Sequence, residues 1–197
     1  MIYELLKLAH IIGAILIGGG LIGVWIHDMR SRQTSELVRF SESVRNIALF
    51  YDAVVVPGAI ILLISGSWLI AVFYDGWSFI RTPWLAGMVL LFIFEFIEGN
   101  TVTRIYFVRL NRLAEKALQT GNFTPELRRT RAQNIPTFTH FLDLPILLLI
   151  VMLGVLKPDN WLLLIYGTIF AIVIAAALML LVTRLYPHYE QNYNTDR

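Results

Sequence analysis

The chain has 197 residues, of which 57 % are hydrophobic and 15 % are charged, and its formal net charge is +2. Soluble proteins are about 45–50 % apolar and about 25 % charged, so this composition excludes a soluble domain, a disordered chain and a nucleic-acid-binding module. The absence of cysteine excludes disulfides, thiolate metal ligands and a cysteine nucleophile.

Five apolar segments of about 20 residues or more are predicted to cross a bilayer as α-helices. They cover residues 2–26, 47–73, 83–102, 136–156 and 161–182. The first is interpreted as a retained span, because its start, Met1-Ile2-Tyr3-Glu4, is not basic as in a signal peptide. The predicted fold class is all-α, a polytopic membrane bundle of five transmembrane helices that forms a single integral-membrane domain over residues 1–197.

The first span contains a lone histidine and a run of glycines. Gly19 and Gly23 have the small-xxx-small spacing that lets another helix approach closely. His10 lies about 6 Å to the outer side of the middle of this span. A neutral imidazole at that depth is suited either to be a single axial ligand of a haem or to hydrogen-bond a neighbouring helix.

Basic residues gather in the segments that join the spans. Thirteen of the 16 Lys and Arg fall between the first two spans, in the 103–135 connection and in the C-terminal tail. The positive-inside rule therefore predicts an outside N-terminus and a cytoplasmic C-terminus. Within the 103–135 connection, a helix is predicted from Tyr106 to Thr120, with a stop at Gly121-Asn122 and a new start at Thr124-Pro125.

Ionisable residues inside the predicted spans are few: His10, Glu95, Glu98, His140 and Asp143, with Asp52 nearer the interface. At about 1.5 Å per residue, Glu95 and Glu98 lie about 3 and 8 Å to the cytoplasmic side of the midplane. His140 and Asp143 lie about 9 and 5 Å to the same side, on a span that runs in the opposite direction. Each pair has i, i+3 spacing, which puts both members on one helix face. The sequence therefore predicts one polar layer that faces the bundle interior.

This polar layer suits several kinds of chemistry. Its carboxylates and imidazole are candidate ligands for a divalent cation such as zinc, manganese or iron. The same groups are suited to relay protons. The alternative is a structural cluster of interhelical hydrogen bonds, with Arg104 or Asn100 neutralising its charge. Pro145 follows directly and can open the helical ladder, which favours a site.

Three stretches of the chain carry a family resemblance. They read LLKLAHIIGAILIGGGLIGVW in the first span, TPWLAGMVLLFIFEFIEGNTVTRIYFVRLNRLAEKA around the third and IPTFTHFLDLPILLLIVMLGVLKPDNW in the fourth. Over nearly the whole chain, they resemble an uncharacterised bacterial family of predicted integral membrane proteins with a domain of unknown function. More distantly, the chain is similar to HemJ-type protoporphyrinogen oxidases and CopD-like membrane proteins.

The features shared with HemJ are the start of the first span at Leu8 to His10, the segment from Asn134 to Thr137, and Lys157-Pro158. That resemblance implies a b-type haem, with His10 as a ligand, and electron passage to a quinone or the respiratory chain. The sequence departs from HemJ in the third span. Where HemJ has Trp-Leu-His-x-Lys, this chain reads Trp84-Leu85-Ala86-Gly87-Met88 and lacks both the histidine and the lysine.

Three functional hypotheses follow. The first is a haem- or metal-binding redox protein, with His10 as the cofactor ligand and Glu95, Glu98, His140 and Asp143 as the metal site. The second is a proton- or cation-coupled carrier that uses the same polar layer. The third is a non-catalytic subunit or assembly factor of a larger membrane complex. The expected partners are the lipid bilayer and a quinone or such a complex, an oligomer is compatible with the sequence, and the expected location is the bacterial inner membrane.

Overall fold

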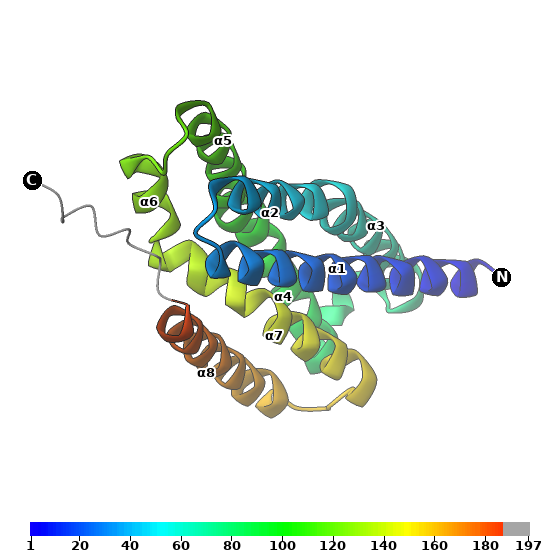
Figure 1. Cartoon of the computed structure of the whole chain (residues 1–197). Coiled ribbons are helices and arrows are strands. Elements are labelled where there is room, and N and C mark those ends of the chain that lie inside the picture. The colour runs from blue at the N-terminus through cyan, green and yellow to red at the C-terminus, as the bar shows by residue number, and fades with distance from the viewer. Residues whose placement is uncertain (187–197) are drawn as a thin grey trace, which may run out of the picture.

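The computed structural model describes residues 1–186 (Figure 1), and its elements there are helices joined by short connections. The long first helix is α1 (Ile2–Gln33). The remaining elements are α2 (Leu37–Phe50), η1 (Tyr51–Val55), α3 (Val56–Phe73), η2 (Gly76–Arg81), α4 (Pro83–Glu98), η3 (Gly99–Thr103), α5 (Arg104–Thr120), α6 (Pro125–Arg131), α7 (Asn134–Leu156) and α8 (Leu162–Leu185). Both η1 and η3 are π-helical turns, whereas η2 is a 3₁₀ helix.

The prediction of five membrane-spanning helices is confirmed. Among the described residues, the helices long and apolar enough to cross a bilayer are Ile2–Gln33, Leu37–Phe73, Pro83–Thr120, Asn134–Leu156 and Leu162–Leu185. The second and third are composite, because α2 continues through η1 into α3, and α4 continues through η3 into α5. Three spans are therefore longer than predicted from hydropathy.

The extra length comes from amphipathic segments that pack on each other. On α2, the apolar side chains of Phe40, Val44 and Ile47 are fully buried. They belong to one apolar core with Phe107 and Ala114 of α5, against which α2 packs. Their spacing of three and four residues produces an apolar stripe rather than an apolar run. A hydropathy average therefore ends these spans too early.

The helices form two groups that meet in the middle of the bundle (Figure 1). In one group, α1 packs against α2, η1 and α3, whereas in the other α7 lies between α4 and α8. Contacts between α1 and α7 join the two groups. Helix α8 packs mainly against α7, at the edge of the bundle. The interior therefore has two adjoining apolar cores, one for each group.

Glycines of α1 allow its close approach to the second composite helix. A Cβ on Gly13 would lie 2.9 Å from the Gly58 carbonyl oxygen, and one on Gly23 would lie 2.6 Å from the Phe50 ring. The predicted pairing of Gly19 with Gly23 is wrong, because a Cβ on Gly19 would meet nothing within 4 Å. Gly19 points away from the neighbouring helix, and Gly20 faces Val55 instead.

The signals read in the 103–135 connection are confirmed. Helix α5 ends at Gly121, whose φ of 72° is a left-handed conformation that favours glycine. Thr124 then caps α6, because its hydroxyl accepts a hydrogen bond from the Leu127 amide at 3.3 Å. The chain turns back here and leads into α7.

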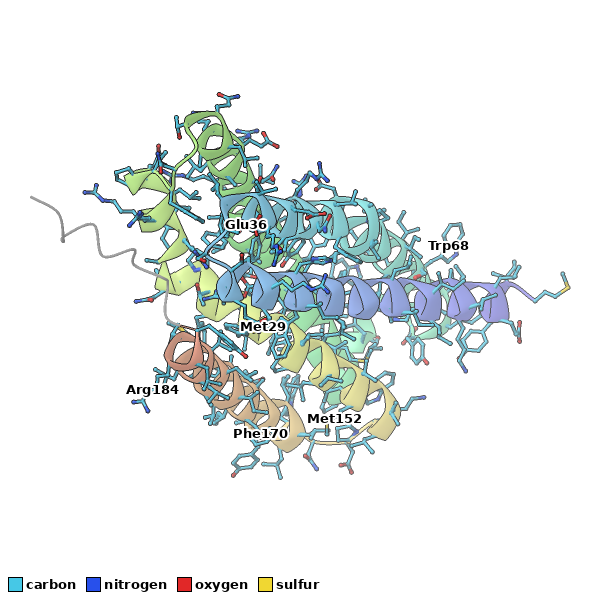
Figure 2. All side chains as sticks on the ribbon, in the orientation of Figure 1. Met29, Glu36, Trp68, Met152, Phe170 and Arg184 are labelled. Atoms are coloured by element: carbon cyan, nitrogen blue, oxygen red, sulfur yellow. The ribbon has the colours of Figure 1, made fainter. Side chains whose placement is uncertain are left out.

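Large apolar side chains cover the outside of the spans (Figure 2). Trp68, Met152 and Phe170 all point away from the bundle, and Phe170 is 65 % exposed. Such continuous apolar exposure is unusual for a water-soluble surface and suits contact with lipid tails. Polar groups are instead enclosed between the helices.

Candidate functional site

The predicted polar layer lies inside the bundle. His140, Asp143 and Glu98 are 1 %, 3 % and 8 % exposed, and Glu95 is half-buried. His140 and Asp143 stand one turn apart on α7, and Glu95 and Glu98 stand near the end of α4. Helices α4 and α7 pack against each other, so the two pairs lie in one layer on adjacent helices. Both Glu95 and Glu98 lie within electrostatic range of Asp143.

Asp143 is held by a tyrosine from the π turn η1. The Tyr51 hydroxyl donates a hydrogen bond to Asp143 Oδ2 at 3.1 Å. The other carboxyl oxygen, Oδ1, is buried and has no hydrogen-bond partner within residues 1–186. The carboxyl groups of Glu95 and Glu98 lie within hydrogen-bond range of Asp143, so a proton on one of the three carboxyl groups can be shared with another.

Glu98 is held by the second π turn. Thr103, the last residue of η3, donates a hydrogen bond to Glu98 Oε1 at 2.6 Å and lies 3.0 Å from the Thr139 hydroxyl. Glu98 Oε2 and Glu95 Oε1 are buried and lack hydrogen-bond partners in the described part of the chain. Each of the three carboxyl groups of the layer thus has one unpartnered oxygen.

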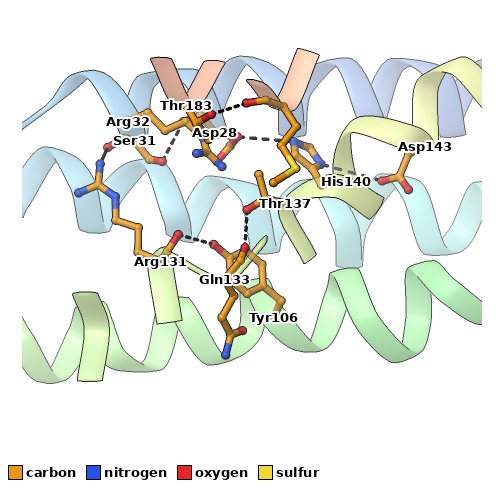
Figure 3. A network of polar contacts seen from close by, with 11 residues as sticks. Asp28, Ser31, Arg32, Tyr106, Arg131, Gln133, Thr137, His140, Asp143 and Thr183 are labelled. Atoms are coloured by element: carbon orange, nitrogen blue, oxygen red, sulfur yellow. Dashed lines mark hydrogen bonds and ion pairs between the residues drawn. The ribbon is translucent and has the colours of Figure 1, made fainter. Parts of the chain in front are cut away.

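His140 connects this layer to a buried ion pair on α1 (Figure 3). Its Nδ1 lies 3.9 Å from Asp143 Oδ2, and its Nε2 lies 3.7 Å from Asp28 Oδ2. Arg32 Nε donates to the same Asp28 oxygen at 2.8 Å, and both members of that pair are 4 % exposed on their side chains. Asp143, His140, Asp28 and Arg32 therefore form a continuous series of charged and titratable groups.

A second arginine joins at the end of this series. Arg131 of α6 donates from Nη2 to the Ser31 carbonyl oxygen at 2.7 Å (Figure 3), and its guanidinium lies over the Phe40 ring. Burial and the neighbouring Arg32 lower the pKa of Arg131 to about 10. The basic end of the bundle is thus tied to its interior.

Sequence reasoning missed Tyr51, Asp28, Arg32 and Arg131 as members of this network. A hydropathy boundary at residue 26 excludes Asp28 and Arg32, although their i, i+4 spacing is that of a helical ion pair. Tyr51 had no signal, because a π turn changes which face of the helix it occupies. Arg131 sits in a separate short helix, and only the tertiary fold brings it to Ser31.

The predicted neutralising roles of Arg104 and Asn100 are wrong. Arg104 donates from Nε to Asp52 Oδ1 at 2.8 Å, and Asn100 donates to the Phe96 carbonyl oxygen at 2.8 Å. Asp52 belongs to η1 and Arg104 directly follows η3, so this ion pair joins the two π turns. The interior carboxyl groups are left without either partner.

A pocket of about 70 Å³ lies where α1, η1 and α3, α4 and α7 meet. Its polar lining includes Glu95 and Asp143, which carry two of the unpartnered oxygens, together with Tyr51 and Arg104. The rest is mainly apolar and includes Phe92, Phe96, Val56, Ala59 and Leu147. Both π turns contribute to the lining, and such turns recur at functional sites.

His10 lies apart from the polar layer. Its Nδ1 is 3.2 Å from the Ser65 hydroxyl, which lies 2.7 Å from the Ile61 carbonyl oxygen of the same helix, α3. Eighteen residues separate His10 from Asp28 on α1, which corresponds to about 27 Å along the helix. The ring packs against the backbone of α3 at Gly66. His10 thus contacts the neighbouring helix.

The arrangement of the side chains in the polar layer differs from that of a metal site. Across residues 1–186, no three His, Asp or Glu side chains are placed so that they could hold one metal ion. Asp143 accepts a hydrogen bond from Tyr51 and Glu98 accepts one from Thr103, so each uses one oxygen for the protein itself.

Comparisons with known proteins give one family. The family profile described as "Predicted integral membrane protein (DUF2269)" matches residues 4–158. The matched region includes the polar layer, both π turns and the pocket. Searches of the curated proteins and of the solved structures found no match. The resemblance to HemJ-type and CopD-like proteins has no support among these comparisons.

Proposed function

This chain belongs to the DUF2269 family of predicted integral membrane proteins, and we propose that it acts as a proton-coupled carrier. The observation that carries this proposal is the set of three carboxyl groups, Glu95, Glu98 and Asp143, inside the bundle. Each has an oxygen without a hydrogen-bond partner in the described residues, and two of them line a pocket. The proton is held and released at these carboxyl groups.

The electrostatics of the cluster support proton binding. Carboxyl groups that share a low-dielectric site cannot all ionise together, so they bind protons and release them one at a time. Arg104 and Arg32 do not neutralise the cluster, because Arg104 is paired with Asp52 and Arg32 with Asp28. Ionisable groups are costly within a membrane and mark proton relays in pumps and transporters.

A purely structural cluster is a weaker interpretation. Buried polar groups that serve only packing are hydrogen-bonded in the great majority of proteins. Here the unpartnered atoms within residues 1–186 include oxygens of all three carboxyl groups and both ring nitrogens of His140. So many unpartnered groups at one level of the bundle favour a site that exchanges protons.

His140 supplies a path for the proton away from the cluster. An imidazole takes up a proton at one ring nitrogen and gives one up at the other. Nδ1 of His140 faces Asp143 at 3.9 Å and Nε2 faces Asp28 at 3.7 Å, so small side-chain rotations bring either pair within hydrogen-bond distance. The last proton acceptor on this path is Asp28, which lies beside Arg32 at the basic end of the bundle.

Proton flux into proteoliposomes tests the proposal. With a pH-sensitive dye inside the vesicles, the wild-type protein is expected to conduct protons above the rate of empty vesicles. The variants Glu98→Gln, Asp143→Asn and His140→Ala should each lose this flux. Glu115→Gln is the control, since Glu115 is exposed on α5. Flux that is unchanged in the three interior variants, at equal protein insertion, contradicts a carrier of this kind.

The orientation of the bundle is part of the same proposal. We place the N-terminus outside and the C-terminus in the cytoplasm of a bacterial inner membrane, on the strength of the basic residues in the connections. In that orientation the series from Asp143 through His140 to Asp28 leads to the cytoplasmic side.

A haem held by His10 is a second candidate function. It is supported by the Nδ1 contact with Ser65, because a second interaction of this kind fixes the ring of metal-ligating histidines. A b-type haem would supply one-electron chemistry at that position. An absorption spectrum with metal analysis of the purified protein tests it. A Soret band that is lost in His10→Ala supports the haem, and its absence from the wild type excludes it.

A further inference from the structure

We propose that the pocket between α1, α3, α4 and α7 binds an organic cation, namely an amine or quaternary ammonium group with an apolar body, in exchange for a proton. The inference names the cargo of the proton-coupled carrier and therefore rests on that proposed function. It is carried by three features of the pocket: unpartnered carboxyl oxygens, aromatic walls and a lining that reaches the lipid-facing side of the bundle.

The carboxyl groups supply the pocket with partners for a cation. Asp143 is 97 % buried, and both Asp143 and Glu95 line the pocket and carry a buried oxygen without a hydrogen-bond partner in the described residues. Arg104 also lines the pocket, but both its Nε and Nη2 contact Asp52 Oδ1 at 2.8 Å. The charge of that arginine is therefore balanced at the rim, and the excess charge in the interior is acidic.

The walls suit a cation that carries apolar groups. Tyr51, Phe92 and Phe96 contribute aromatic rings to the lining, and the Phe92 and Phe96 ring centroids are 6.0 Å apart. Aromatic faces attract ammonium groups by cation–π interaction, most strongly where water is excluded. Val56, Ala59 and Leu147 supply the apolar remainder. A strongly hydrated inorganic ion would gain little from such walls.

The pocket borders on the outer surface between α3 and α4. These two helices are joined through η2 but do not form a packed pair, since α3 packs on α1 and α4 packs on α7. The lining residues Val56, Ala59 and Phe96 are half-buried, so they also form part of the bundle surface. A cation with an apolar body partitions into the bilayer interface and can enter from that side.

The exchange follows from charge balance. A protonated carboxyl group at the pocket loses its O–H bond when the cation arrives, the resulting carboxylate pairs with the cation, and the proton leaves to water. The reverse step releases the cation. Groups that face this site from the surrounding elements are Tyr51 and Asp52 of η1, Glu98 of α4, Arg104 of α5, His140 of α7 and Asp28 of α1.

Binding of tetramethylammonium, a compact quaternary cation suited to a pocket of about 70 Å³, to the purified protein in lipid nanodiscs tests the proposal. Isothermal titration should show saturable binding, and a parallel titration in weak buffer should show release of one proton per cation. Glu95→Gln and Asp143→Asn should each weaken binding by about tenfold or more, because each removes a charge partner in a desolvated site. tert-Butanol, an uncharged analogue of similar size, should not bind measurably.

Two further variants separate loss of binding from loss of folding. Ala59→Phe fills the pocket without changing a charged group, so it should abolish both cation binding and the proton release that accompanies it. Glu4→Gln, at an exposed position near the start of α1, should bind as the wild type does. Each variant is compared by size-exclusion profile and tryptophan emission, so that only folded protein is scored.

The outcomes distinguish the two proposals. Equal binding in wild type, Glu95→Gln and Ala59→Phe, binding without proton release, or equal binding of the uncharged analogue would each overturn the cation site. Proton flux in proteoliposomes without any cation binding leaves the carrier in place and removes this cargo. Saturable, proton-linked binding without flux supports the pocket assignment and counts against transport.

Discussion

At the scale of single residues, the interior of this protein combines one satisfied ion pair with several unsatisfied groups. Asp28 and Arg32 are paired at 2.8 Å, whereas Glu95, Glu98 and Asp143 keep oxygens without partners in the described residues. Breaking a buried pair leaves a charge that nothing compensates. The two kinds of group should therefore respond differently to substitution, with the pair governing stability and the carboxyl cluster governing proton binding.

The ion pair predicts a large effect on stability. Arg32→Ala should lower the free energy of unfolding by about 3–5 kcal/mol, because it leaves Asp28 charged and buried. Arg39→Ala is the matched control, since its pair with Glu36 has side chains 75 % and 55 % exposed. That change should cost less than about 1 kcal/mol. Unfolding in detergent micelles with increasing denaturant measures both, and equal midpoints would show that the interior pair has no special role.

The sequence identified Glu95, Glu98, His140 and Asp143 as candidate site residues because acidic and basic residues are rare inside apolar spans. Depth and i, i+3 spacing alone placed both pairs in one layer of the bundle. They did not show that the pairs face each other, because that depends on the rotation of each helix about its axis. The remaining members were out of reach for a physical reason. Asp28 and Arg32 lie on a polar extension of α1, and their burial depends on α7, which is distant in sequence.

At the scale of elements, the crossing of α1 and α3 depends on two glycines. Gly13 and Gly58 bring the helices so close that a Cβ on Gly13 would meet the backbone of α3, which cannot rotate away. The sequence indicated a close approach by α1 at Gly19 and Gly23. Only Gly23 faces a neighbour, because the rotation of α1 about its axis is set by the helices around it. By contrast, the Gly121 stop and the Thr124 cap were predictable, since they depend only on local backbone chemistry.

These contacts predict opposite effects for two glycines on one helix. Gly13→Ala should destabilise the protein by about 1–3 kcal/mol, because α1 and α3 must move apart. Gly19→Ala should leave stability unchanged or raise it slightly, as nothing lies within 4 Å and alanine favours a helix. Thermal unfolding of both variants in the same detergent provides the measurement. A destabilised Gly19→Ala beside an unaffected Gly13→Ala would refute this packing.

At the scale of the whole molecule, the polar series and the basic connections lie toward the same end of the bundle. The five spans were predictable from length and hydropathy, because a bilayer requires apolar helices of a minimum length. A helix over Tyr106–Thr120 was also predicted, but its continuity with the third span, and the extension of the first span to Gln33, were not. Amphipathic helices on a membrane protein resemble ordinary polar connections by composition.

The proposed orientation predicts which connections face outward. Because the chain has no cysteine, single cysteines can be introduced without removing any. Ser78→Cys, in the exposed η2 connection, should react with a membrane-impermeant maleimide in intact cells. Asn122→Cys, between α5 and α6, should react only after the membrane is opened. The reverse pattern would place the basic connections outside and invert the direction of the proton path.

The two π turns give the composite helices a property that their length alone does not. Each turn contains one residue more than an α-helical turn. The helix after the turn is therefore rotated about its axis by about 100° relative to the helix before it. In both composite helices the more apolar part, α3 or α4, faces lipid. The amphipathic part, α2 or α5, presents an apolar stripe to its partner helix. The turn therefore sets the direction of the apolar stripe on one part of the helix relative to the lipid-facing surface of the other part. Removing one residue from η1 would abolish this rotation and turn Tyr51 away from Asp143.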